Sequence, residues 1–185
     1  MDSVLNWDFI VPSMFGRDLT DQVRADAQGG DRMVPVIVEK CIEAVEEHGT
    51  SSHNYCSYHT NRSAAMDLEG IYRKTGGIGQ SKAITQLFER GDYDSFDLCD
   101  SERFTDICSI TSVLKTYFRS LPVPLLSFDL HESFIAAAQI KDNATKAAAL
   151  GDLVKKLPSE HYYTLRMLML HLNRYVSFKL RGLTD

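Results

Sequence analysis

The chain has 185 residues, of which 44% are hydrophobic and 24% charged, a composition typical of a folded soluble domain. The net charge of −5 argues against a nucleic-acid-binding protein, because phosphate contacts need a basic surface. The first residues show no basic segment followed by an apolar core, so no signal peptide is expected. No apolar run approaches the length of a membrane span. We therefore expect a cytoplasmic protein without a transmembrane segment.

Apolar residues recur with a helical period from residue 34 onward, and we find no convincing strand pattern or internal repeat. The sequence therefore predicts an all-α fold. The first predicted helix begins near Pro35 and ends before Gly49. Its apolar stripe consists of Ile37, Val38, Cys41, Ile42 and Val45.

Two further helices are expected in the middle of the chain, over residues 81–90 and over residues 104–120. The second of these has Ile107, Ile110, Leu114, Tyr117, Phe118 and Leu121 on one side. Pro122 ends it, because proline cannot continue a helix. Cys108 lies on this apolar stripe, as Cys41 does on the first one. Both are expected to be free buried thiols in a reducing compartment, since the four cysteines (Cys41, Cys56, Cys99 and Cys108) contain no C-x-x-C pair.

Three more helices are predicted toward the end of the chain. Ser127 is expected to cap a helix that contains Phe134 and Ile135, and Asp142 is expected to start the next one. The last predicted helix covers residues 162–176 and is apolar on more than one side, which is typical of a helix inside a bundle. One stripe consists of Leu165, Leu168, Met169, Leu172 and Val176, and Met167 and Leu170 point elsewhere.

Residues 50–65 are polar and aperiodic, and they are long for a loop in a compact domain. We expect a disordered insertion here. His53, Cys56 and His59 suggest zinc as an alternative, but their spacing matches no common ligand pattern and no fourth ligand is evident. The sequence therefore predicts no metal site.

The segment EGIYRKTGG places Arg73 immediately before Gly76 and Gly77. An arginine at the entrance to so permissive a turn indicates a side chain that is presented to a partner. The glycines do not complete a phosphate-binding loop, and the chain contains neither G-x-S-x-G nor H-E-x-x-H. No self-contained active site is therefore expected.

Lys115 and Arg119 lie four residues apart, so they share one face of the predicted helix over residues 104–120. No acidic residue stands three or four positions from either of them. The pattern leaves two interpretations open. The cations belong to a solvated basic face, or they bind an acidic or phosphate-bearing partner.

EGIYRKTGG followed by LKTYFRSLPVPLL resembles the Rho GTPase-activating protein (RhoGAP) domain. The resemblance begins at FGRDL (residues 15–19), includes VPVIVEKCIEAVEEHG, and extends through LPSEHYYTLRMLMLHLNRYV. It implies a RhoGAP-like helical bundle over residues 15–185, after an upstream segment, residues 1–14. FGRDL with IYRKTGGIGQ is most similar to RhoGAPs that also carry LIM domains.

The resemblance implies a GTPase activator that is not an enzyme by itself. Arg73 matches the family's catalytic arginine finger, and Gly70, Gly76 and Gly77 belong to the loop that carries it. Lys115 and Arg119 match cations that steady this loop and contact the GTPase. The implied partner is a Rho-family small GTPase in its GTP-bound state. The domain would need no cofactor of its own, because GTP and Mg²⁺ are bound by the partner, which could also recruit it to the membrane or cortex.

One departure concerns the end of the chain. In the family a further motif, with an asparagine that contacts the GTPase, follows the helix that matches residues 165–176, and closing helices come after it. Here the sequence ends at FKLRGLTD. We therefore expect a C-terminally truncated domain whose last helices are missing. The alternative function is a module that binds the GTPase without activating it.

Overall fold

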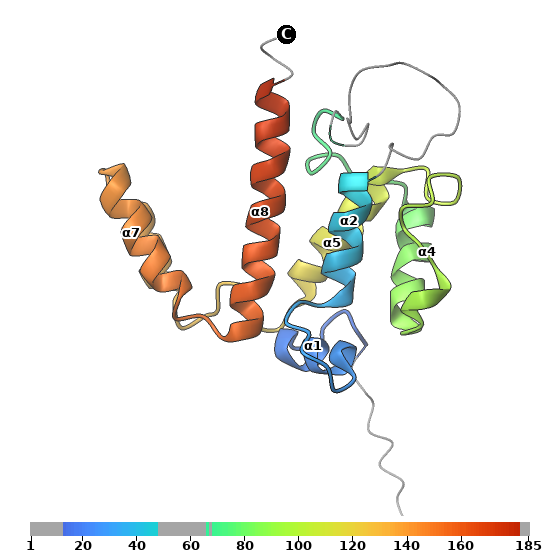
Figure 1. Ribbon diagram of the computed structural model, residues 1–185, viewed down its shortest axis with the longest axis horizontal. Helices are drawn as coiled ribbons and strands as arrows, with labels where there is room; N and C mark the ends of the chain where they lie inside the picture. Colours follow the sequence, from blue (N-terminus) through green and yellow to red (C-terminus); the bar gives the residue numbers. More distant parts are fainter. Residues whose placement is uncertain (1–12, 48–65, 67, 182–185) are drawn as a thin grey trace, which may run out of the picture.

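A computed structural model describes residues 13–47, 66 and 68–181 of the chain, with side chains up to residue 177. The regular elements in these ranges are helical, as the sequence predicts (Figure 1). They are α1 (Leu19–Ala27), α2 (Val36–Glu47), α4 (Ile78–Glu89), the short 3₁₀ helix η1 (Tyr93–Ser95), α5 (Ile107–Ser120), α6 (His131–Ala138), α7 (Asn143–Val154) and α8 (Ser159–Arg181). None of the helices in the described ranges is long and apolar enough to cross a lipid bilayer.

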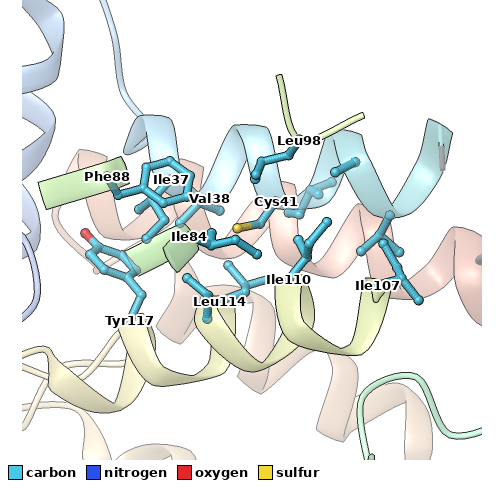
Figure 2. Close-up of a cluster of buried hydrophobic side chains, with 14 of the residues drawn as sticks. Ile37, Val38, Cys41, Ile84, Phe88, Leu98, Ile107, Ile110, Leu114 and Tyr117 are labelled. Carbon is cyan, nitrogen blue, oxygen red and sulfur yellow. The ribbon is translucent and has the colours of Figure 1, made fainter. Parts of the chain in front are cut away.

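The core lies where α5 packs against both α2 and α4. Apolar side chains from the three helices converge there, joined by Leu98 from the segment between η1 and α5 (Figure 2). The labelled members are Ile37, Val38 and Cys41 of α2, Ile84 and Phe88 of α4, and Ile107, Ile110, Leu114 and Tyr117 of α5. This confirms the stripes predicted for the helices that became α2 and α5.

The starts of α4 and α5 differ from the predicted ones by three residues each. Helix α5 begins at Ile107 rather than at residue 104, because the Asp106 carboxylate caps it by accepting a hydrogen bond from the Cys108 backbone N–H at 3.0 Å. Helix α4 begins at Ile78 rather than at residue 81, with Gly77 as its N-cap. The N-terminal ends of α4 and α5 therefore both lie beside the glycines of the EGIYRKTGG segment.

The sequence reading missed helix α1. Asp18 caps it by accepting a hydrogen bond from the Thr20 N–H at 2.9 Å, and Leu19, Gln22 and Val23 are buried. Leu19 and Val23 are the buried large apolar residues among the nine of this helix, and two are too few to define a helical stripe. The buried amide of Gln22 donates to Asp26 at 2.7 Å, so a polar residue occupies part of the inner face.

Helices α6 and α7 pack against each other, and α7 leans away from α8 (Figure 1). The prediction that Ser127 caps α6 is wrong. Ser127 has a φ of +58°, its N–H donates to the Pro124 carbonyl at 2.8 Å, and α6 starts four residues later, after Leu130. Pro122 and Pro124 precede this tight turn, and the helix begins only after it. Asp142 does cap α7, as predicted, and accepts a hydrogen bond from the Thr145 N–H at 2.8 Å.

Helix α8 packs against α1 and α2 along one side. Its buried residues are His161, Thr164, Leu165 and His171. The predicted stripe is wrong in part, because Met169 and Val176 are about half exposed, at 48% and 52%, and Leu168 and Leu172 are only partly buried. His161 and His171 are buried on the contact side and make hydrogen bonds there, so hydrophobicity alone misplaces part of the buried side of the helix.

Cys41 and Cys108 are buried free thiols, as predicted, and Cys99 is a partly exposed free thiol. Burial raises the pKa of the Cys41 thiol far above its ordinary value. Cys56, His53, His59 and the expected insertion over residues 50–65 lie outside the described residues. Within the described ranges, no group of three or more His, Cys, Asp or Glu side chains is arranged to hold a metal ion.

Candidate functional site

Arg73 lies in a tight turn that we call the arginine loop, residues 70–77. Gly70 has a φ of +69°, a left-handed conformation that favours glycine. Its carbonyl accepts hydrogen bonds from the backbone N–H groups of both Arg73 and Lys74, each at 2.8 Å. A Cβ at Gly70 would lie 3.4 Å from the Arg73 Nε, so the arginine side chain passes close over this glycine. The Arg73 side chain is exposed.

Side chains of helix α5 donate hydrogen bonds to the backbone carbonyl groups in the first half of the arginine loop. The Thr111 hydroxyl, fully buried, donates to the Ile71 carbonyl at 2.9 Å. The Lys115 Nζ donates to the carbonyl of Tyr72 at 2.9 Å and to that of Lys74 at 3.2 Å. Lys115 therefore fixes the backbone immediately before and immediately after Arg73.

The second half of the loop lies directly on the first turns of α5. A Cβ at Gly76 would stand 2.1 Å from the Ser109 backbone nitrogen, so only glycine fits at this position. The Gly76 N–H donates to the Ser112 hydroxyl at 3.1 Å. Gly77 has more room, because its Cβ would meet only ordinary contacts, at 3.7 Å or more. Gly76 is thus the loop glycine whose backbone closely approaches α5.

Asp106 joins the loop to the start of α5. Its Oδ2 accepts hydrogen bonds from the Gly77 N–H at 2.7 Å and from the Ser109 hydroxyl at 2.6 Å, and the same hydroxyl lies 3.2 Å from the Gly77 carbonyl. Burial raises the pKa of Asp106, but the hydrogen bonds from Ser109, Gly77 and Cys108 outweigh it and lower the pKa. The carboxylate is therefore ionised at neutral pH. The Asp106 backbone N–H donates to the side-chain oxygen of Gln80 at 2.9 Å, so Asp106 joins the start of α5 to the start of α4 as well as to the loop.

The cations differ in what they contact. Lys115 is half-buried against the loop, whereas Arg119, one turn further along α5, is exposed and donates to the Thr116 hydroxyl at 3.1 Å. In the described part of the chain, neither these two side chains nor Arg73 pairs with a carboxylate. The structure thus brings Lys115 and Arg73 together through the loop backbone, and it leaves Arg119 on the same helix as a separate surface cation.

The sequence analysis identified Arg73, Gly70, Gly76, Gly77, Lys115 and Arg119 as candidate residues. It missed four polar residues that anchor the loop, at the N-cap and in the first two turns of α5. These anchors are Asp106, Ser109, Thr111 and Ser112. Thr111 gave a signal, because it lies four residues after Ile107 and three before Leu114 and is therefore a polar residue on the apolar stripe. Ser109 lies off that stripe, and its burial is known only from the structure. Buried hydroxyl groups need partners, and the neighbouring loop supplies them.

An exposed guanidinium on an anchored backbone is suited to meeting an anionic group of another molecule. Arginine stays charged at every physiological pH, and its planar fork offers five N–H donors. Because the backbone on both sides of Arg73 is already hydrogen-bonded, little conformational freedom of the loop is left to lose when the side chain makes such a contact.

Comparison with known proteins identifies the family. The model of the RhoGAP domain matches residues 54–180. The human Rho GTPase-activating protein 27 is 36% identical over 143 residues, which cover 77% of this chain and 14% of that protein. The chicken Rho GTPase-activating protein 15 is 35% identical over 141 residues, covering 76% of this chain and 26% of that protein.

A solved structure shows the same fold. The crystal structure of the human Rho GTPase-activating protein 15 superposes with a TM-score of 0.73 and 29% identity, covering 90% of this chain and 68% of that one. The chain spans only about one quarter or less of the length of the two curated relatives named above. The family model, the sequence identity and the shared helical fold together show that this chain belongs to the RhoGAP domain family.

Proposed function

We propose that this domain stimulates GTP hydrolysis by a Rho-family small GTPase, with Arg73 inserted into the partner's nucleotide site as an arginine finger. One observation carries the proposal. The Arg73 side chain is exposed and pairs with no carboxylate in the described part of the chain, yet Lys115 holds the carbonyl groups on both sides of it. Such an arrangement presents a charge outward while its backbone stays fixed.

The chemistry of phosphoryl transfer explains why this helps. As the bond to the γ-phosphate breaks, negative charge grows on the bridging oxygen and on the transferring group. A guanidinium supplied from outside neutralises this charge and adds directed hydrogen bonds. Arginine fingers of this kind accelerate hydrolysis by about 10³–10⁵, or about 4–7 kcal/mol of the barrier.

The other site residues have supporting roles in this proposal. Lys115 steadies the arginine loop, Arg119 contacts the GTPase surface, and Gly70 and Gly76 allow the loop its shape on α5. The domain contributes no cofactor, because GTP and Mg²⁺ belong to the partner. It is an activator rather than a self-contained enzyme, acting in signal transduction.

Three finer points are part of the proposal as well. The functional domain covers residues 15–185, after an upstream segment of residues 1–14. Membership of the subgroup with LIM domains rests on FGRDL and IYRKTGGIGQ, and the similarity to Rho GTPase-activating proteins 27 and 15 does not favour it over other subgroups. A cytoplasmic location, with recruitment to the membrane or cortex through the GTPase, follows from the kind of partner.

A second candidate is a module that binds the GTPase without activating it. The observation in its favour is the incomplete burial of α8, where Met169, Leu170 and Val176 are 42–52% exposed. Full burial of such a side chain contributes about 1.5–3 kcal/mol, so each of these half-exposed side chains forgoes roughly half of that amount. A less stable domain could bind its partner and still hold Arg73 too loosely for catalysis.

The test measures binding and catalysis separately. Rho-family GTPases loaded with GTP are mixed with excess domain in single-turnover hydrolysis, and affinity is measured with a non-hydrolysable GTP analogue. Acceleration of hydrolysis by at least one of the GTPases supports the activator. Measurable affinity without any acceleration supports the binding module, and absence of both contradicts the two candidates together.

A further inference from the structure

Tyr72, the residue before Arg73, is fixed at both ends. Its carbonyl accepts a hydrogen bond from Lys115 of α5 at 2.9 Å. Its side chain packs against the core, and its hydroxyl is hydrogen-bonded to the Nε2 of His171 on α8. The two rings meet edge to face, with centroids 5.8 Å apart. His171 is completely buried, so this contact is closed to solvent on the histidine side.

The other ring nitrogen of His171 determines the direction of this hydrogen bond. Its Nδ1 lies 2.7 Å from the Glu46 Oε1 of α2, and the same carboxylate oxygen accepts a hydrogen bond from the Arg174 Nε at 2.8 Å. Burial lowers the pKa of His171 more than the neighbouring Glu46 raises it, so the imidazole is neutral at pH 7. Because a carboxylate only accepts, the proton lies on Nδ1, and Nε2 must accept from the Tyr72 hydroxyl.

A directed relay therefore runs from the arginine loop through α8 to α2. The Tyr72 hydroxyl donates to His171, His171 donates to Glu46, and Arg174 donates to the same carboxylate. In this arrangement each of the polar groups has the partner that it needs. In the described structure, His171, Arg174 and Glu46 make no hydrogen bond to Arg73 itself.

We propose that His171 is a positioning residue for Arg73, acting through the Tyr72 hydroxyl. The inference rests on the proposed function, in which Arg73 is the finger. Lys115 holds the backbone of Tyr72 from one side, and His171 holds the tip of its side chain from the other. Loss of either removes one of the two hydrogen bonds that fix the residue before the finger, which widens the range of positions that the guanidinium samples.

The experiment separates the two nitrogens of His171 by substitution. His171→Asn keeps a donor near the position of Nδ1, beside Glu46, and removes the acceptor for Tyr72. His171→Gln reaches the position of Nε2 and restores an acceptor for the Tyr72 hydroxyl, while it gives up the contact with Glu46. Tyr72→Phe removes the hydroxyl alone.

His161 supplies the matched control. It lies on the same helix, is 3% exposed, and has its Nδ1 3.0 Å from the Leu125 carbonyl, away from the arginine loop. His161→Asn therefore removes a buried histidine of α8 at comparable structural cost and leaves the relay intact.

Single-turnover hydrolysis is measured at increasing concentrations of each variant. His171→Asn and Tyr72→Phe are expected to lower the rate at saturation by about tenfold, the value of roughly one hydrogen bond, with the half-saturating concentration unchanged. The double variant should be no slower than the slower single variant. His171→Gln and His161→Asn should keep most of the saturating rate. A relay that only stabilises the fold would not produce this split.

A second measurement does not depend on activation. Hydrogen exchange of the Arg73 and Lys74 amides, which donate to Gly70, reports whether the loop is held in the free protein. His171→Asn should speed this exchange, and His161→Asn should not. If the parent domain fails to activate any GTPase but the exchange differs in this way, the proposed function is wrong and the positioning stands. Equal exchange and equal saturating rates for His171→Asn and the parent domain overturn the inference.

Discussion

The core helices α2 and α5 and the pair α6–α7 differ sharply in how they are packed. Seven residues of α2 and eight of α5 are buried, whereas α6 buries only Ala137 and α7 buries none. Ile135 of α6 is 42% exposed, and Phe128 just before it is 64% exposed. One part of the domain is therefore a tightly packed core, and the other is an arm held mainly by its own two helices.

This difference explains where the exposed arginine is placed. Its loop takes hydrogen bonds from α5, the helix that contacts both other core helices, and not from the arm. A mobile charge can meet a phosphate, but only a fixed one is already in place when the charge develops. The domain thus keeps the side chain of the proposed finger in solvent and the groups that hold its loop on the core helix α5.

Gly76→Ala is expected to have the largest effect, because it disrupts the packing of the arginine loop on α5. The added methyl group would stand 2.1 Å from the Ser109 nitrogen, which belongs to the backbone of α5 and cannot move aside easily. We expect a loss of about 3 kcal/mol or more in the free energy of unfolding, or displacement of the loop with loss of activation. Denaturant unfolding and single-turnover hydrolysis together measure it.

Gly77→Ala is the matched control, because a Cβ there meets nothing closer than 3.7 Å. It should change the free energy of unfolding by less than about 1 kcal/mol. If both variants unfold and activate like the parent domain, the loop does not lie on α5 as described.

A comparison of two isoleucines sharpens the contrast between core and arm. Ile110→Ala leaves a cavity between α5 and α2 and should cost about 2–5 kcal/mol of unfolding free energy. Ile135→Ala, at a half-exposed position of α6, should cost less than about 1 kcal/mol. Equal losses in urea unfolding would show that the arm packs as firmly as the core.

Substitutions of Lys115 and Arg119 should distinguish support of the arginine loop from contact with the GTPase. Lys115→Ala removes the donor to the Tyr72 and Lys74 carbonyls, so we expect the saturating hydrolysis rate to fall by about tenfold. Arg119→Ala removes an exposed cation that makes no hydrogen bond to the loop in the described structure, so it should chiefly raise the half-saturating concentration. Unchanged rate and affinity in both variants would restore the interpretation of a solvated basic face.

A smaller effect is expected from pH. The pKa of His171 in the folded domain is below its ordinary value of 6.5, chiefly because the side chain is buried. The unfolded chain therefore binds a proton near pH 6.5 that the folded chain does not. The contribution of His171 to the free energy of unfolding is fully present above this pH and is lost as the pH falls below it. The charged and titratable groups around His171 are Glu46 of α2, Tyr72 of the loop and Arg174 of α8.

Thermal melts between pH 7.5 and 5 should show this decrease in the parent domain and a weaker one in His171→Asn. Asp106 does not interfere, because its pKa is lowered from 3.8 and its contribution is lost only at more acidic pH. Identical pH profiles for the two proteins would mean that His171 does not titrate differently in the folded state.

The sequence was sufficient for the parts of the fold that depend on local pattern. The stripes of α2 and α5, the cap at Asp142, and the position of Arg73 before its glycines can all be read from neighbouring residues. The RhoGAP resemblance also rested on two continuous motifs. These features need no knowledge of which helix lies beside which.

Features that depend on distant residues could not be read in this way. The Tyr72–His171 hydrogen bond joins residues 99 positions apart, and the contact between Gly77 and Asp106 joins residues 29 positions apart. The side of α8 that faces the core is set by polar residues such as His171, whose partners come from α2 and the loop. Hydrophobic periodicity carries no information about such partners, which is why the stripe predicted for α8 was partly wrong.

The most direct test of the account is the substitution of Arg73 itself, measured as the saturating rate of single-turnover GTP hydrolysis by a Rho-family GTPase. Arg73→Ala should lose most of the acceleration, about 10³-fold or more, while affinity for the GTPase bound to a non-hydrolysable analogue stays within a few-fold of the parent value. Arg73→Lys should recover little, because the planar fork is lost. Arg90→Ala, an exposed arginine at the end of α4, is the control and should retain full activity. Full acceleration by Arg73→Ala would contradict the finger assignment and, with it, the proposed mechanism.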